Sequence, residues 1–335
     1  MSRLRGIDRN LVAVVLLVLL LSPLPQLLGR FEIGLAVRIL LFALLATAWN
    51  LMSGFAGEFS FGHAAFFGVG AYTSGWLLIH HHLSPWLGML AGAGLAAALG
   101  VGIGLVSFRY RLKGVYFALG TFALAEVLRI IANGSELVNA SRGLNVPLLP
   151  GASWAMLQFP AGAPEYFYIA LGLLASALIL VIGLLRSRWG LLILAVRDDA
   201  DAASAAGIDA LRWRLLAIAL SAGITGIAGS FWLQYYFFLN PELAFGSALS
   251  IEILLPAVVG GVRTIWGPVI GAVAVVMLGQ WAAALGRTPP SELSFLRGVH
   301  GLDLLIYGAA LVVIVIVLPR GLFGLARSRR LGGTA

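Results

Sequence analysis

Cysteine, charge and the short motifs of common enzymes are scarce in this sequence of 335 residues. There is no cysteine, which excludes disulfides and thiol chemistry and leaves the redox compartment undefined. Charged residues make up 11% of the chain and hydrophobic residues 60%, whereas a soluble domain carries about 25% charged residues. The chain is therefore predicted to be a membrane protein with several spans.

The motifs of nucleotide and metal chemistry are also missing. The sequence has no GxxxxGK[ST] phosphate loop, no HExxH and no GxSxG pattern. His80, His81 and His82 are contiguous, but adjacent helical residues point in different directions, so a polar cap at the membrane interface explains them better than a metal site. We predict that the chain is not an enzyme and binds no metal or cofactor of its own.

Apolar runs long enough to cross all or most of a bilayer recur along the chain. They predict an all-α membrane bundle of about ten spans, forming one domain over residues 1–335. The runs lie near 11–28, 33–53, 61–79, 86–108, 115–131, 166–185, 214–238, 247–262, 266–286 and 302–318.

The basic residues lie in short clusters beside these runs rather than in one stripe, which argues against nucleic acid despite a net charge of +8. If both termini are cytoplasmic, most of the 22 basic residues fall on the inner side, as the positive-inside rule requires. Arg3, Arg5 and Arg9 precede the first run, but no small-x-small cleavage site follows, so we predict an uncleaved first span.

The stretch from Trp49 to Trp76, WNLMSGFAGEFSFGHAAFFGVGAYTSGW, predicts a break in a membrane helix. Gly54 and Gly57 allow the backbone to leave helical geometry, and we expect Ser60 to cap a helix restarting at Phe61. Glu58 and His63 place polar groups where the bilayer makes them costly. Broken helices survive in membranes only beside other helices or a water-filled cavity, so we expect this break, at mid-bilayer depth, to line a pathway.

A row of small residues follows this break in the sequence. Small residues repeat every fourth position at Gly88, Gly92, Ala96, Gly100 and Gly104, which predicts close contact with another helix.

Polar residues also interrupt later spans. Glu126 and Arg129 have the i, i+3 spacing of a pair on one helical face, which a neutralised interfacial pair explains at least as well as a gate. Glu252 and Pro256 precede a tight turn at 259–268, a second irregular element that could face the first.

The main inner loop, 186–214, predicts a short amphipathic helix over Leu191–Ala206, ended by Gly207. Helices that lie on membranes usually bring basic residues to anionic lipid. This one carries Arg197 but also Asp198, Asp199 and Asp201, so we predict a protein partner instead.

Several separated motifs together resemble permease subunits of branched-chain amino-acid ABC importers, and most closely the M-type subunit of the leucine/isoleucine/valine system. The signature NLxxGxAGxxSxGHAxFxxxGAY is matched from Asn50 to Tyr72. The likeness continues through Arg111, Lys113, Gly114, Tyr116, Phe117, Thr121, Glu126, Arg129, Ser250, Ile251, Glu252, Gly260, Gly261, Trp266, Gly267, Pro268, Gly271, Pro319, Arg320, Gly321, Leu322 and Gly324.

The resemblance implies a type II ABC importer permease with broken helices near the centre, in the inner membrane. Asp201, Ala202, Ala203 and Gly207 resemble the EAAxxxG coupling motif, with Asp in place of Glu. The implied partners are a second, H-type permease, two ATPase subunits that bind ATP and Mg, and an external solute-binding protein. The ATPase contacts would then be Arg197, Asp198, Asp199, Asp201, Ala202, Ala203 and Gly207.

Candidate residues of the substrate pathway are Asn50, Glu58, Ser60, His63, Tyr72, Glu126 and Glu252. Glu58 departs from the family, which often has an uncharged polar residue there. A carboxylate could meet the ammonium of an amino acid, or it could lie in water at the cytoplasmic mouth. The alternatives to branched-chain amino-acid import are a related importer of urea or short amides, and an ion-coupled secondary transporter that would need no coupling loop.

Overall fold

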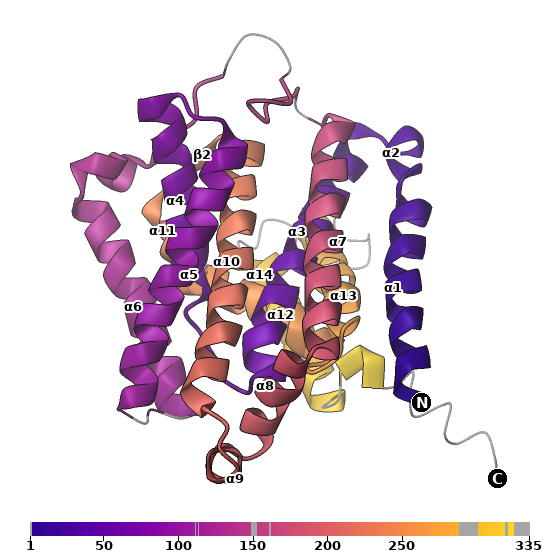
Figure 1. Cartoon of the computed structure of the whole chain (residues 1–335). Coiled ribbons are helices and arrows are strands. Elements are labelled where there is room, and N and C mark those ends of the chain that lie inside the picture. The colour runs from indigo at the N-terminus through magenta and orange to yellow at the C-terminus, as the bar shows by residue number, and fades with distance from the viewer. Residues whose placement is uncertain are drawn as a thin grey trace, which may run out of the picture.

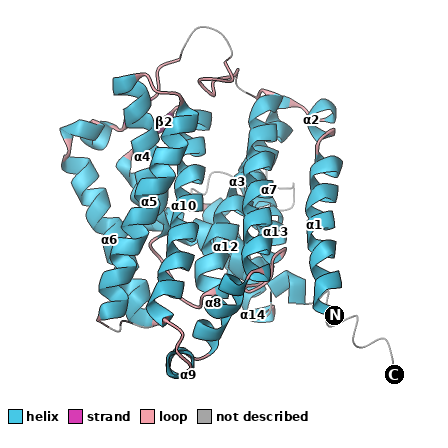
Figure 2. Cartoon of the chain, in the orientation of Figure 1, coloured by secondary structure: helices cyan, strands magenta, loops and turns pink. Residues whose placement is uncertain are grey.

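The structure is a computed structural model that describes residues 2–110, 112, 114–148, 153–160, 162–287, 301–318 and 321–324. Almost all of this part of the chain is helical (Figures 1 and 2). The predicted all-α membrane bundle is therefore confirmed. Arg111, Lys113, Pro319 and Arg320 lie outside the described residues.

Eight described helical segments are long and apolar enough to cross a membrane. They are Arg9–Leu27, Arg30–Phe55, Pro85–Arg109, Val115–Gly134, Pro164–Arg186, Ala210–Tyr236, Pro241–Gly260 and Gly267–Leu285. The expected runs at 61–79 and 302–318 also form helices, α4 (His63–His81) and α14 (Leu302–Val317). In α14 the apolar helical stretch of described residues is shorter, Leu305–Ile314, so ten is an approximate count.

Helix α3 (Arg30–Trp49) runs through the middle of the bundle. Nearly all of its side chains from Val37 onward are buried, because it packs on α7 (Pro164–Arg186), α10 (Ala210–Tyr236), α12 (Ser247–Gly260) and α13 (Gly267–Arg287). At one edge, α1 (Ser2–Leu21) and the short α2 (Leu24–Leu27) lie against α7 (Figure 1).

Helices α4, α5 (Pro85–Arg109) and α10 form the most tightly packed part of the molecule. The small residues of α5 predicted to allow close approach are all buried. A Cβ atom at Gly92 would lie 2.7 Å from the carbonyl oxygen of Gly70 in α4, and one at Gly70 would lie 2.2 Å from that of Gly226 in α10. The prediction of close helix contact along this face is confirmed.

The N-terminus and the pair α8 (Arg188–Asp198) and α9 (Ala200–Ala205) lie at one end of the bundle (Figure 1). At the opposite end, the segment after α6 (Val115–Gly134) forms two short 3₁₀ helices, Glu136–Val138 and Ala140–Arg142. Strand β1 (Leu144–Asn145) then pairs antiparallel with β2 (Phe238–Leu239), which links this segment to α11 (Pro241–Phe245).

A valine at Gly92 tests the close packing of α5. Forcing extra atoms into a packed helix contact costs about 1–3 kcal/mol, so we expect Gly92→Val to lower the thermal unfolding temperature of the purified protein. Gly94→Val is the matched control on the same helix, because no atom lies within 4 Å of a Cβ atom there. Equal melting temperatures for the two variants would contradict this packing.

Candidate functional site

The predicted helix break is present between α3 and α4. After Trp49 the chain widens into a π-helix, Asn50–Phe55, and then leaves helical geometry at Gly57, whose φ of +82° favours glycine. Helix α4 begins only at His63, with Gly62 as its N-cap. The expectation that Ser60 caps a helix starting at Phe61 is therefore wrong, and its hydroxyl instead accepts a hydrogen bond from the Gly62 N–H at 3.1 Å.

The break lies at the α8 end of the bundle rather than at mid-depth. The helical segment that leads into it, Arg30–Phe55, has 26 residues, a length of about 39 Å, and so already exceeds an apolar core of about 30 Å. The π-helix also contacts α8. The chain thus completes a membrane crossing before it turns back into α4.

Asn50 joins the break to the turn between α12 and α13. Its side-chain Nδ2 donates to the carbonyl of Thr264 at 2.8 Å, and its Oδ1 accepts from the N–H of Arg263 at 2.9 Å. One amide thus satisfies two backbone groups of a turn more than 200 residues away in sequence. The two irregular elements face each other, as predicted.

The carboxylate of Glu58 is buried and paired. Arg214 in α10 places its Nε 2.9 Å from Glu58 Oε1, while its guanidinium lies 5.3 Å from the ring centre of Phe108. Ser53 donates to the Glu58 carbonyl at 3.1 Å. The carboxylate is therefore neither free for a substrate ammonium nor immersed in water; instead, it ties the break to α10.

His63 and Ser60 also take part in fixed contacts. The Trp49 indole donates to the Ser60 carbonyl at 2.8 Å. His63 Nε2 lies 3.0 Å from the hydroxyl of Ser221, which itself donates to the carbonyl of Ala48 at 2.6 Å. Because that hydroxyl proton is used, Nε2 is the donor in the histidine–serine contact. The start of α4 is thereby attached to α10 and to the end of α3.

Tyr72 and Glu252 lie farther from the break along their helices. Tyr72 is buried and stacks on Phe245 of α11, with ring centres 5.5 Å apart. Glu252 is partly buried in α12. The structure thus brings Asn50, Glu58, Ser60 and His63 together, with Tyr72 about two and a half helical turns beyond His63.

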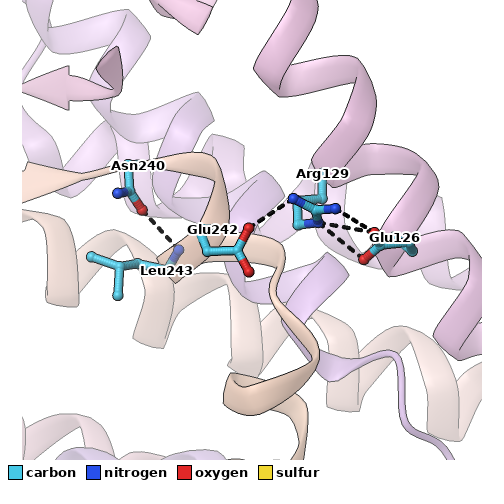
Figure 3. A network of polar contacts seen from close by, with 5 residues as sticks. All are labelled: Glu126, Arg129, Asn240, Glu242 and Leu243. Carbon is cyan, nitrogen blue, oxygen red and sulfur yellow. Dashed lines mark hydrogen bonds and ion pairs between the residues drawn. The ribbon is translucent and has the colours of Figure 1, made fainter. Parts of the chain in front are cut away.

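Glu126 and Arg129 form the predicted pair, with a third member that the sequence does not indicate (Figure 3). Arg129 Nε donates to both carboxylate oxygens of Glu126, at 3.1 and 3.0 Å. Its Nη1 donates to Glu242 of α11 at 2.7 Å, and Asn240 caps the same short helix through the Leu243 N–H. This network fastens α6 to α11, away from the break.

The segment predicted to be one helix over Leu191–Ala206 is two helices. Asp199 leaves helical geometry and its side chain accepts hydrogen bonds from the N–H groups of Asp201 and Ala202, so it caps α9 and separates it from α8. Gly207 ends the unit with a φ of +83°, as expected. Asp198, Asp201 and Ala202 are exposed, and Ala203 is buried against the core.

Arg197 of α8 lies directly on the break. Its side chain pairs with Asp198 at 2.9 Å, and a Cβ atom added at Gly57 would lie 2.6 Å from Arg197 Cγ. Glycine is thus required at this position both by its φ angle and by the closeness of α8. Any displacement of α8 toward the bundle presses on the residues of the break.

Sequence reasoning missed the partners that hold the site together. Arg214, Ser221 and Thr264 come from other elements, and their contacts depend on how the helices pack. Arg214 is a charged residue at the start of an apolar run, and a charge in that position needs a partner. The sequence therefore held a signal that Arg214 forms an ion pair.

The family model for the permease component of branched-chain amino acid transport systems matches residues 32–316. The chain belongs to this family. The permease is 25% identical to the high-affinity branched-chain amino acid transport system permease protein LivM of Escherichia coli (strain K12), over 96% of this chain and 76% of that protein.

Permease proteins with other named substrates match less of the chain. The fructose import permease FrcC of Rhizobium meliloti is 24% identical over 61% of this chain and 58% of its own length. The L-arabinose permease AraH of Azospirillum brasilense is 27% identical over 70% of this chain and 66% of its own length. No solved structure gives a significant match.

Replacing Asn50 tests its role as the link between the two irregular elements. Asn50→Ala leaves a backbone N–H and a carbonyl unsatisfied, at about 1–3 kcal/mol each, so we expect the free energy of unfolding in detergent to fall by roughly 2 kcal/mol or more. Asn145→Ala, on the exposed face of β1, is the control. An Asn50→Ala variant as stable as the control would show that the link carries no stability.

Proposed function

We propose that this permease subunit imports the branched-chain amino acids leucine, isoleucine and valine across the inner membrane. Transport proceeds by alternating access and is driven by ATP hydrolysis on two partner ATPase subunits, which hold ATP and Mg. The contact of Arg197 in α8 with Gly57 in the break carries this proposal, because it joins an exposed acidic element to the broken helix.

The two ends of the bundle support the proposed partners. Exposed Asp199 and Asp201 give the start of α9 an acidic patch, which suits a basic groove on an ATPase subunit. The distribution of basic residues supports a cytoplasmic position for this end and for both termini. The opposite end, with β1 and β2, then faces the external solute-binding protein, and an H-type second permease completes the pathway.

The choice of substrate rests on the relatives. The LivM protein, which is named for branched-chain amino acids, matches nearly the whole chain, whereas the sugar permeases match 61% and 70% of it. A sugar is therefore the second candidate. The sequence leaves urea or a short amide as a further alternative substrate. An ion-coupled carrier has no ATPase partner, so it would not need α8 and α9 as a coupling element.

Uptake by cells that depend on this chain distinguishes these substrates. We expect deletion of the chain to abolish uptake of radiolabelled leucine at micromolar concentration, and isoleucine and valine to compete with leucine in the intact cells. Urea, fructose and L-arabinose should not compete. Unchanged leucine uptake after deletion, or uptake that persists when ATP is depleted but the ion gradient is kept, would contradict the proposal.

A further inference from the structure

Among the described residues, two opposite charges in spanning helices have no ion-pair partner. Arg38 lies in α3 and Glu252 in α12, and both are partly buried within spanning helices. Among the described residues neither forms an ion pair or a side-chain hydrogen bond, and Arg38 Nε is buried without a partner. Unpaired charges are costly at this depth, and this cost marks them as functional.

Arg38 and Glu252 lie at similar levels of two helices that pack together. Arg38 precedes the Asn50 link by twelve residues, or about 18 Å of helix, and Glu252 precedes Gly260 by eight residues, or about 12 Å. Since Asn50 bonds to the turn that follows Gly260, these two levels differ by only about 6 Å. Helices α3 and α12 pack together, so the two side chains belong to neighbouring elements.

A row of aromatic rings begins beside Arg38. The Arg38 guanidinium lies 5.7 Å from the ring centre of Phe42, which meets Trp232 edge to face at 6.3 Å. Trp232 in turn lies beside Tyr236, with ring centres 4.4 Å apart. A separated positive and negative charge beside an apolar wall is complementary to a molecule with both charges and an apolar side chain.

We propose that Arg38 and Glu252 bind the two charges of an amino acid as it passes through the permease. The guanidinium donates hydrogen bonds from its planar fork to the substrate carboxylate, and the Glu252 carboxylate accepts hydrogen bonds from the ammonium. Phe42, Trp232 and Tyr236 cover the side chain. This assignment rests on the proposed import of amino acids. It places substrate contact about 12–18 Å from the break, which then acts in coupling rather than recognition.

Ligand binding to the purified importer, without its solute-binding protein, tests each charge separately. The ligands are leucine, leucinamide, which lacks the carboxylate, and 4-methylpentanoate, which lacks the ammonium; binding is followed by tryptophan fluorescence. We expect leucine to bind about 10- to 100-fold more tightly than either analogue, the loss typical of one charged hydrogen-bonding group. Arg38→Gln should bind leucine and leucinamide equally, and Glu252→Gln should bind leucine and 4-methylpentanoate equally.

The controls separate recognition from folding. Arg30→Gln on α3 and Glu136→Gln at the outer end change exposed residues and should keep the preference of the unmodified importer. Affinity ratios report only on folded protein, so a partial loss of folding does not mimic the effect. Variants of Arg38 and Glu252 that still prefer leucine over both analogues would overturn the proposal.

A double variant tests a purely structural role. If the two charges only stabilise each other, Arg38→Gln with Glu252→Gln should restore leucine transport to the level of the unmodified importer, and this result would overturn the proposal. If the charges bind substrate, the double variant should transport no better than either single variant. An importer that carries leucine but binds none in the purified state contradicts this inference alone, whereas absence of leucine import contradicts the proposed function as well.

Discussion

A backbone that leaves helical geometry inside an apolar bundle must find hydrogen-bond partners, and this requirement organises the structure around Asn50. Its amide satisfies the turn after α12 from the π-helix that ends α3, so two irregular segments supply each other's missing partners. Three further hydrogen bonds hold the break in the same way. Ser53 donates to the Glu58 carbonyl, the Trp49 indole donates to the Ser60 carbonyl, and His63 donates to the Ser221 hydroxyl. The broken helix is therefore held in a fixed conformation by contacts from α10 and from the turn after α12.

That fixed break lies where α8 meets the bundle. Arg197 packs on Gly57, and Arg214 pairs with Glu58 from the neighbouring α10. The proposed coupling would use these short contacts to pass movement of α8 to the spanning helices. The proposed substrate contacts at Arg38 and Glu252 lie deeper, on α3 and α12, which both lead into the Asn50 link. On these proposals, coupling and recognition take place at different levels of the same helices, which the Asn50 amide joins.

The sequence was sufficient for features that depend on local composition. The spans follow from apolar runs, the break from Gly57, and the close packing of α5 from its row of small residues. Predictions from the sequence were wrong where one residue decides between two local conformations. Asp199 caps a second helix instead of continuing the first, and the residue before α4 is Gly62 rather than Ser60. Partners such as Arg214 and Glu242 could not be predicted, because only the packing of distant helices brings them to Glu58 and Arg129.

The central claim is that α8 acts through the break. The most direct test is the number of leucine molecules that a reconstituted Gly57→Ala importer takes up per ATP hydrolysed. The added Cβ atom would meet Arg197, so the account predicts a lower ratio with ATP hydrolysis retained, and recovery when Arg197→Ala is added. Gly114→Ala is the control, because Gly114 also has a positive φ, +57°, but no atom lies within 4 Å of a Cβ atom there. A Gly57→Ala importer that transports as many leucine molecules per ATP as the control would contradict the account.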